Sequence, residues 1–364
     1  MFPYVINCDW LQVYAEDKNE AYLDDIYNGK SLYTFEKLPH SSRHFSEIWN
    51  IYNVDNDLYC VIQRKPFSNI LSKCGAVLQL VNRELYKDNF VTPFLYFLER
   101  HHFRFKSISR LDISFDFHLL YNGLKPESLI KGIMLGKYLK NNQSKVKWNF
   151  SSIANVGKPM VCNSCSFGSL NSAVSTKLYN KSLELKEVKQ KPYIIESWIL
   201  NGLNPDNDVW RIEITIKSDA SKSINLSTGE IFRLTPNNVK LHSDLEDVFF
   251  SYAAKYFAFK HNDGKKNKTR MKDLQIFPTE RKPTIYPVRI TEESDSTRSD
   301  KIFLKKLHHI HKEIPTHDFE VEQAINVISD AFSRGKRLME YRNTKILNIE
   351  RRDLNIDDNI LNEL

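Results

Sequence analysis

The sequence has few cysteines and no long apolar run. Only Cys162 and Cys165, two of five cysteines in 364 residues, form a C-x-x-C pair. A structural zinc site needs four ligands, and without a second pair the sequence does not predict one. No apolar stretch reaches the roughly 20 residues of a membrane span, and Asp9 interrupts the apolar N-terminal stretch. We therefore expect no signal peptide, no membrane partner, reduced thiols and a cytoplasmic protein.

The sequence also lacks an internal repeat of fixed period. Its composition is 41% hydrophobic and 12% aromatic, enough for one sizeable domain with an appendage. The net charge of +7 suits a polyanionic partner. Many proteins without such a partner share this charge, so composition alone does not decide the function.

Short strand patterns alternate with helical patterns over residues 1–261, which we take as one catalytic domain. The expected fold class is α+β, a largely antiparallel sheet with flanking helices. The expected strands are Ile6–Tyr14, Leu58–Gln63, Ala76–Val81, Ser109–His118, Val146–Phe150, Met160–Phe167, Ser175–Asn180 and Val209–Lys217. The expected helices are Phe94–Arg104, Lys125–Lys140, Ile194–Leu203 and Leu241–His261.

The segment Ser109–His118 has the period-two pattern of a half-buried strand with one apolar face. Its other face carries Arg110, Asp112, Ser114 and Asp116. Aspartate is depleted in strands, and Mg²⁺ and Mn²⁺ prefer carboxylate oxygens, so two aspartates on one face indicate a metal site. The alternative is an Arg110–Asp112 ion pair with Asp116 at a fraying strand end.

The segment Val209–Lys217 repeats this arrangement. Its polar face carries Arg211 and Glu213, a cation and a carboxylate two residues apart. An ordinary cross-strand charge pair, with a stabilising effect of about 0.2–1 kcal/mol, is the alternative.

A third segment, Ser166–Glu184, contains a tyrosine between two lysines, Lys177-Leu-Tyr179-Asn-Lys181. Tyrosine is a poor nucleophile at its ordinary pKa of about 10, and neighbouring lysines favour the phenolate and attract phosphate. In an extended segment, residues 177, 179 and 181 share one face. A strand tyrosine flanked by solvated lysines is the alternative for the tripeptide alone.

Taken in order, the strand RLDISFDF, the block FGS…S…KLYNK..E and the strand WRIEITIK resemble the rolling-circle replication initiation factors of plasmids and phages. The same domain occurs in relaxases of some conjugative elements. The N-terminal segment INCDWLQVYA resembles the opening of this family, and the resemblance spans residues 5–260.

The resemblance implies a reaction in which Tyr179 attacks one DNA phosphodiester. The tyrosine is joined to the 5′ phosphate and a 3′ hydroxyl is freed as a primer, which is covalent catalysis. Mg²⁺ or Mn²⁺ is the implied cofactor. Asp112 and Glu213 are the first expected ligands, followed by Asp116 and Glu184. Lys181, Arg211 and Glu184 are the expected catalytic groups around the nucleophile, and the two cations would stabilise charge on the phosphate.

The resemblance also implies the partners. DNA is expected as an origin or transfer site in single-stranded, cruciform or supercoiled form, together with a helicase, host replication proteins and a second copy of the chain. The protein is then expected in the bacterial cytoplasm, encoded by a plasmid, phage or integrative element. A relaxase with the same chemistry, or a sequence-specific DNA-binding protein without catalysis, is the alternative.

Residues 262–300 form an expected basic, polar linker, and residues 301–364 an expected helical region. Cations with DNA-binding potential are Lys177 and, in the linker, Lys265, Lys266, Lys268, Arg270 and Lys272. A solvated linker is the alternative for that stretch. His309-Ile310-His311 lies in a helical pattern, which would direct the two histidines apart, so we interpret it as a surface cluster.

Overall fold

The computed structural model describes residues 3–18, 32–68, 71–141, 148–153, 161–169, 172–187, 190–265, 268–278 and 284–288. Two compact units divide the chain, Met1–Arg289 and Ile290–Leu364. Only the first unit contains described residues. The expected helical region at 301–364 and the pair His309 and His311 lie outside them.

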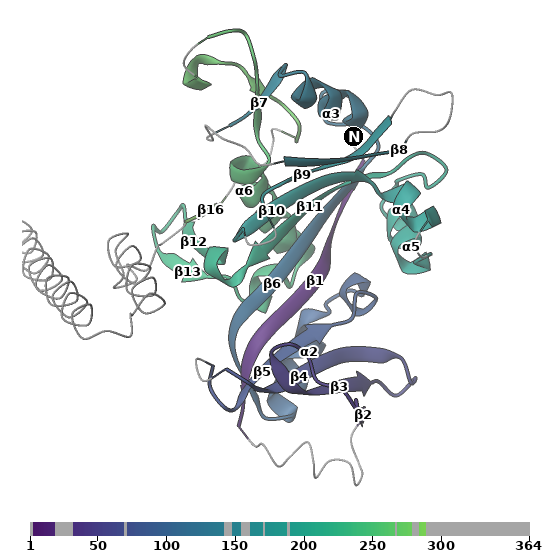
Figure 1. Cartoon of the computed structure of the whole chain (residues 1–364), viewed down its shortest axis with the longest axis vertical. Coiled ribbons are helices and arrows are strands. Elements are labelled where there is room, and N and C mark those ends of the chain that lie inside the picture. Colours follow the sequence, from purple (N-terminus) through teal and green to yellow (C-terminus); the bar gives the residue numbers. More distant parts are fainter. Residues whose placement is uncertain are drawn as a thin grey trace, which may run out of the picture. The chain divides into compact units, whose positions relative to one another are not determined.

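One antiparallel sheet dominates the described part of the chain (Figure 1). Ten strands lie in the order β2-β3-β4-β5-β1-β6-β11-β10-β9-β8. This confirms the expected α+β class with a largely antiparallel sheet. The strands are β1 Tyr4–Asp17, β2 Thr34–Lys37, β3 Phe45–Tyr52, β4 Leu58–Pro66, β5 Gly75–Leu80, β6 Phe103–Phe117, β8 Trp148–Ile153, β9 Val161–Phe167, β10 Val174–Asn180 and β11 Trp210–Lys217.

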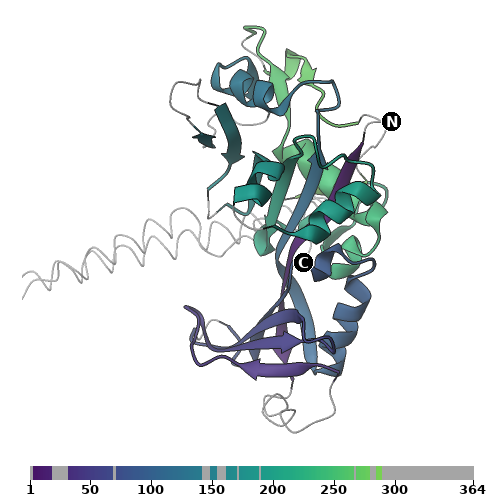
Figure 2. The same ribbon diagram turned by 90° about the vertical axis from the view of Figure 1, so that its right-hand side faces the viewer.

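Strands β1 and β6 hold two halves of the sheet together. They pair with each other from Tyr4↔Phe117 to Asp17↔Phe103. Strand β5 pairs with the second half of β1, and β11 pairs with the second half of β6. We call β2–β5 with the adjoining ends of β1 and β6 the N-terminal half, and β8–β11 with the opposite ends the C-terminal half. The two halves lie one below the other in Figures 1 and 2.

Five α-helices and four short 3-10 helices are found in the described residues. None of these helices is long and apolar enough to span a membrane. The α-helices are α2 Val91–Arg100, α3 Pro126–Met134, α4 Lys181–Glu187, α5 Pro192–Leu200 and α6 His242–Tyr256, and the 3-10 helices are η2 Glu84–Tyr86, η3 Ser218–Ala220, η4 Pro236–Val239 and η5 Lys268–Arg270.

All four expected helices end earlier than their apolar patterns suggested, and for α2 and α3 the backbone shows why. Helix α2 stops at Arg100 because His102 adopts a left-handed backbone with φ of 60°. Helix α3 stops at Met134, two residues before Gly136, which has φ of 69°. In both cases the residues that follow enter a strand, so the apolar spacing continued although the helix did not.

A large apolar core covers one face of the sheet, and a second, smaller apolar cluster includes residues of α4 and α5. The large core includes Phe97 of α2, Phe249 of α6 and alternate residues of β1 such as Leu11. Phe115 of β6 stacks on Phe249 with ring centroids 5.2 Å apart. Because side chains alternate along a strand, the intervening residues of β1, β6, β10 and β11 lie on the opposite, polar face.

The first unit continues past residue 261, the boundary expected from composition. Two small sheets contain the later strands, and β15 and β16 pair with strands that precede residue 262. Met271 and Leu274 bury their side chains, so apolar residues within the basic stretch hold it to the fold. The small sheets consist of β7 Tyr138–Lys140, β14 Phe259–His261 and β15 Asp273–Leu274, and of β12 Lys222–Asn225, β13 Ile231–Arg233 and β16 Ile285–Pro287.

Candidate functional site

The three strands that carry the expected site residues lie side by side as β6, β11 and β10. Across β10 and β11, Tyr179 pairs with Arg211, and Lys177 pairs with Glu213. Across β11 and β6, Arg211 pairs with Asp116. Strand register therefore brings residues more than 90 positions apart in the sequence onto one polar face.

Tyr179 is hydrogen-bonded to a carboxylate. Its hydroxyl donates to Oε2 of Glu213 at 3.0 Å, and the residue is only 6% exposed. Burial, followed by the charge of Glu213, raises the pKa of Tyr179 well above its ordinary value. Lys177 and Lys181 lie over the ring, with Nζ 4.2 and 5.5 Å from its centroid. Burial and Glu213 thus favour the neutral phenol, whereas the neighbouring lysines were expected to favour the phenolate.

Glu213 belongs to a group of carboxylates that repel one another. Burial, followed by the charges of Asp112 and Asp9, raises its pKa to about 7. Burial also raises the pKa of Asp112, although Arg110 donates to both its oxygens, at 2.9 and 2.5 Å. The Arg110–Asp112 ion pair weighed from the sequence is thus present, and it lies beside two further carboxylates.

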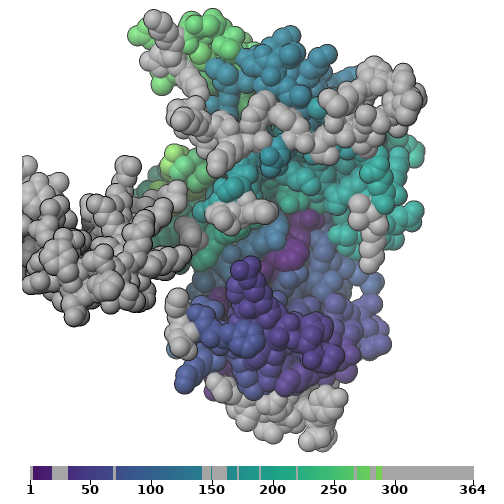
Figure 3. Space-filling model, in the orientation of Figure 1, coloured from purple at the N-terminus to yellow at the C-terminus, as the bar shows by residue number. Residues whose placement is uncertain are grey.

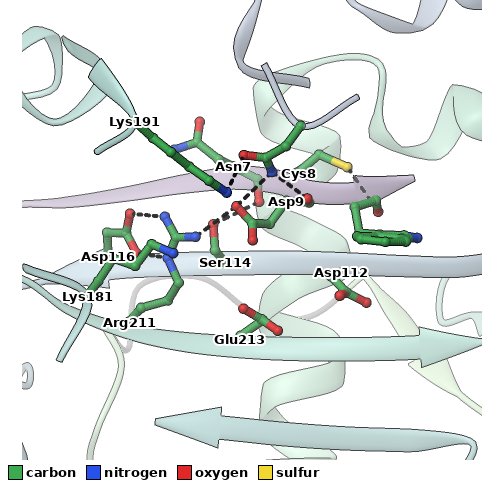
Figure 4. A network of polar contacts seen from close by, with 12 residues as sticks. Asn7, Cys8, Asp9, Asp112, Ser114, Asp116, Lys181, Lys191, Arg211 and Glu213 are labelled. Atoms are coloured by element: carbon green, nitrogen blue, oxygen red, sulfur yellow. Dashed lines mark hydrogen bonds and ion pairs between the residues drawn. The ribbon is translucent and has the colours of Figure 1, made fainter. Parts of the chain in front are cut away.

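Arg211 is completely buried on this face (Figure 4). Its Nε and Nη2 donate to the two oxygens of Asp116 at 2.6 and 2.7 Å. Its Nη1 donates to Asp9 at 2.8 Å, and Nη2 also donates to the hydroxyl of Tyr86 at 3.0 Å. These contacts use the guanidinium for positioning. The expected role of Arg211 was to stabilise charge on the phosphate, but its side chain has no exposed surface with which to contact one.

Asp116 is a buried anchor within the sheet and does not lie at a fraying end. It pairs with Val5 on one side and Arg211 on the other. Its Oδ2 accepts a third hydrogen bond, from Trp198 Nε1 of α5 at 2.6 Å. Both oxygens are occupied by donors, so we remove Asp116 from the expected metal ligands.

Asp9 is a site residue that sequence reasoning missed. Cys8 pairs with Ile113 and Trp10 with Asp112, so Asp9 is the extra residue of a β-bulge in β1. Burial alone would raise its pKa, but Arg211 and Lys181 outweigh burial and lower it. The available signal was local. Two residues, Asp9 and Trp10, separate the apolar residues Cys8 and Leu11, where strict alternation would place one.

Lys181 and Glu184 lie on a helix and do not extend the tyrosine strand. Strand β10 ends at Asn180, whose Oδ1 accepts the backbone N–H of Leu183 and so caps α4. Nζ of Lys181 lies 3.0 and 3.1 Å from the two oxygens of Glu184. Lys181 is 2% exposed, and burial lowers its pKa. The expected alignment of residues 177, 179 and 181 on one strand face is wrong, although Lys181 remains close to the ring of Tyr179.

The expected DNA-binding cations differ in their surroundings. Lys177 is exposed beside Tyr179. Lys265 forms an ion pair with Asp263 at 2.6 Å, whereas Arg270 and Lys272 are exposed. Lys266 and the side chain of Lys268 lie outside the described residues.

Comparison with solved structures finds a chain of similar fold. It is described as the structure of a rolling circle replication initiator protein from Geobacillus stearothermophilus. The TM-score is 0.48 and the sequence identity is 14%, and the match covers 75% of this chain and 93% of that one. No protein-family model matches the sequence, and no curated protein matches it.

The carboxylates provide oxygen donors for a divalent cation, but not a closed cage. In the described residues, no group of three or more His, Cys, Asp or Glu side chains is arranged to hold a metal ion. Mg²⁺ usually takes one or two carboxylates and completes its shell with water and substrate phosphate. Such an open site fits the chemistry of Asp112, Glu213 and Asp9. The like charges of Asp112 and Asp9 raise the pKa of Glu213.

Proposed function

We propose that this chain is a rolling-circle replication initiator that nicks and rejoins DNA through Tyr179. The hydrogen bond from the Tyr179 hydroxyl to Glu213, at 3.0 Å, carries the proposal. A nucleophile whose pKa is raised requires a base within hydrogen-bond reach, and a base is most effective when its pKa lies near the working pH. Glu213, with a pKa of about 7, meets both conditions.

In the proposed reaction, Glu213 takes the proton as the tyrosine oxygen attacks phosphorus. A bond forms between this oxygen and the phosphate, and the bond from phosphorus to the 3′ oxygen breaks. The 3′ oxygen takes a proton from water and becomes the primer hydroxyl. Rejoining is the reverse, in which the 3′ hydroxyl attacks and Tyr179 recovers the proton from Glu213.

The remaining polar groups have separate roles in this proposal. Arg211 holds Asp116 and Asp9 in place, which fixes the ends of three strands around the tyrosine. Lys177 is the exposed cation over the ring and would pair with the incoming phosphate. Lys181, held by Glu184, supplies a second positive charge on the buried side.

A divalent cation is part of the proposal. Asp112 and Asp9 would hold it, with water and the substrate phosphate completing its shell, which leaves Glu213 as the base. When bound, the cation would offset the negative charge that develops on the phosphate oxygens. Asp112 would first have to exchange its ion pair with Arg110 for the cation.

The test is a nicking assay on supercoiled plasmid that carries the DNA flanking the protein's own gene. The plasmid is incubated with Mg²⁺ or Mn²⁺ and analysed on denaturing gels for nicked circles and a covalent protein–DNA adduct. Tyr179→Phe should remove both products, as should EDTA. Tyr96→Phe is the matched control, because Tyr96 is an exposed tyrosine on α2.

Each outcome has a definite meaning. An adduct that forms with Tyr96→Phe but not with Tyr179→Phe supports the proposal. A nicked product that persists in Tyr179→Phe would assign the nucleophile elsewhere. Binding without nicking in the unmodified protein would replace the nickase with a DNA-binding protein.

A further inference from the structure

A second polar surface adjoins the candidate site on the same face of the sheet. Arg110 of β6 pairs with Gln12 of β1, Gln12 with Gln79 of β5, Gln79 with Val61 of β4, and Val61 with Asn50 of β3. We call these five residues the amide row. Apart from the ion-paired Arg110, its polar members are uncharged amides. Its members are half-buried, so the row is accessible to a ligand.

The amide row begins beside an aromatic ring. The guanidinium carbon of Arg110 lies 4.4 Å from the ring centroid of Trp10. Trp10 Nε1 donates to Oε1 of Gln12 at 3.2 Å, and Trp10 pairs with Asp112. The stack thus joins the amide row to the carboxylates around Tyr179.

Exposure distinguishes this stack from a purely structural one. Arg64 and Trp49 form the same type of pair in the N-terminal half, at 5.2 Å, and each is 2% exposed. In contrast, 37% of the Arg110 side chain is exposed, and Trp10 is half-buried. A half-buried tryptophan with a partly exposed cation over its face is a surface on which a flat ring can stack.

Positive charge is placed along the same line. Lys217 of β11 pairs with Arg110 and so extends the amide row toward the C-terminal half. Neighbouring strands lie about 4.8 Å apart, so the three strand steps from β10 to β1 span roughly 14 Å. Tyr179 is in register with Asp116, and Trp10 pairs with Asp112, four residues or roughly 13 Å further along β6. The resulting separation of about 20 Å is the length of a few nucleotides, with a phosphate at Tyr179 and a base at Trp10. Figure 3 shows the purple and blue surface of the N-terminal half adjoining the teal surface of the C-terminal half.

We propose that Trp10, Arg110 and Gln12 bind an unpaired base of single-stranded DNA, a few nucleotides from the phosphate that Tyr179 attacks. The proposal rests on the function proposed above and identifies the form of its substrate. The base stacks on the indole, Arg110 turns to the base or its phosphate, and Gln12 donates to a base edge. Single-stranded DNA is favoured over duplex because the base faces of a duplex are already stacked and closed to an indole, whereas single-strand binding uses such aromatic platforms.

The experiment measures how much the bases contribute to binding. Fluorescence anisotropy compares two 20-nucleotide probes, oligo(dT) and a fully abasic strand of equal length and charge. Tyr179→Phe in the full chain is used as the parent, so that no cleavage occurs. Trp10→Leu, Trp10→Phe and Tyr96→Leu are added to it, the last as a matched loss of an exposed aromatic on α2.

The parent should bind oligo(dT) more tightly than the abasic strand by about 10-fold, the effect of stacking one base. Trp10→Leu should remove most of this preference, whereas Trp10→Phe and Tyr96→Leu should keep it. An unchanged preference in Trp10→Leu would overturn the proposal. Thermal unfolding checks that the variants fold. If Trp10→Leu does not fold, the quenching of tryptophan emission by oligo(dT), which Trp10→Phe should lose, decides instead.

This experiment separates the two proposals. Loss of the preference in Trp10→Leu with no nicking by the unmodified protein keeps the base subsite and removes the nickase. Nicking with an unchanged preference keeps the nickase and removes the subsite.

Discussion

The two halves of the sheet contain the same buried motif with different surroundings. In each half an arginine pairs across strands with a carboxylate, Arg211 with Asp116 and Arg64 with Glu47. In each half β1 supplies a second carboxylate, Asp9 to Arg211 and Asp17 to Arg64. The arginine–carboxylate pair is therefore a structural device of this fold and does not by itself mark a site.

The surrounding charges distinguish the two motifs. Glu47 also accepts from Lys37 and Lys65, at 2.9 Å each, and its pKa is lowered to about 2. The Arg211 motif instead lies beside two further carboxylates, one of which is Glu213 with its pKa raised to about 7. The excess of negative charge, more than the presence of an ion pair, indicates where a cation or a reactive group belongs.

Removal of each arginine would have the largest effect. Arg211→Gln should lower the free energy of unfolding by about 3–5 kcal/mol, because it leaves buried carboxylates uncompensated. Arg64→Gln should lower the free energy of unfolding by less, because Glu47 keeps its ion pairs with Lys37 and Lys65. Urea unfolding of both variants at pH 7.5 measures the difference, and equal losses would contradict the proposed contrast.

Neutralisation of the two glutamates should change stability in opposite directions. The folded pKa of Glu213 lies above its ordinary 4.5, so its ionisation destabilises the fold as pH rises from about 4.5 to 7. Glu213→Gln should therefore stabilise the protein at pH 8, by about 2–3 kcal/mol, and have little effect at pH 4.5.

The pKa of Glu47 is lowered, so its contribution is present above pH 4.5 and is lost as pH falls toward about 2. Glu47→Gln should destabilise the protein at pH 8, by roughly 2 kcal/mol after allowance for its partly exposed lysines. Thermal unfolding in EDTA at pH 4.5 and 8 tests both variants. The same sign for the two at pH 8 would remove the contrast.

Nicking should depend on pH through the same glutamate. As the proposed base, Glu213 must be ionised, so the rate should rise with pH up to about 7 and then level off. At pH 6 the rate should be roughly 10-fold below the plateau. Single-turnover adduct formation measures it, and a rate that falls with pH over this range would exclude Glu213 as the base.

The smallest expected effect comes from the helix that supports Asp116. Trp198→Phe removes one of three hydrogen bonds to this carboxylate and should cost about 1–2 kcal/mol. Urea unfolding measures the loss, and Trp210→Phe is a comparison at another buried tryptophan of the C-terminal half. No loss beyond that of the comparison would show that Asp116 is held by Arg211 alone.

The sequence predicted the strands that carry the candidate site, because alternation is a local property, but it missed β2 and β3. The period-two patterns of β6 and β11 identified which residues share the polar face, and the structure aligns these faces on adjacent strands. The local pattern does not show which residue lies opposite on the neighbouring strand or which helix packs on that face. Whether Asp116 meets a cation, water or Trp198 depends on a helix 82 residues away.

The missed residue and the unexpected rise in the pKa of Tyr179 have related causes. Asp9 enters the site only because β1 bulges, and a bulge breaks the period from which strand faces are read. Lys177 and Lys181 lie two residues from Tyr179 in the sequence, whereas burial and a carboxylate from another strand raise its pKa. Neither burial nor the cross-strand neighbour can be read from the local sequence.

The bulge at Asp9 also has a consequence in genetic terms. It is a single extra residue, so it corresponds to one codon in the gene. Without that codon, the irregularity between Cys8 and Trp10 would be removed, and the contact from β1 to Arg211 would be lost. A second deletion or insertion elsewhere in β1 would shift every following side chain to the other face, including Trp10 and Gln12. The register of β1 against β6 therefore sets both surfaces at once. A point substitution keeps this register and cannot reproduce the effect of a deletion.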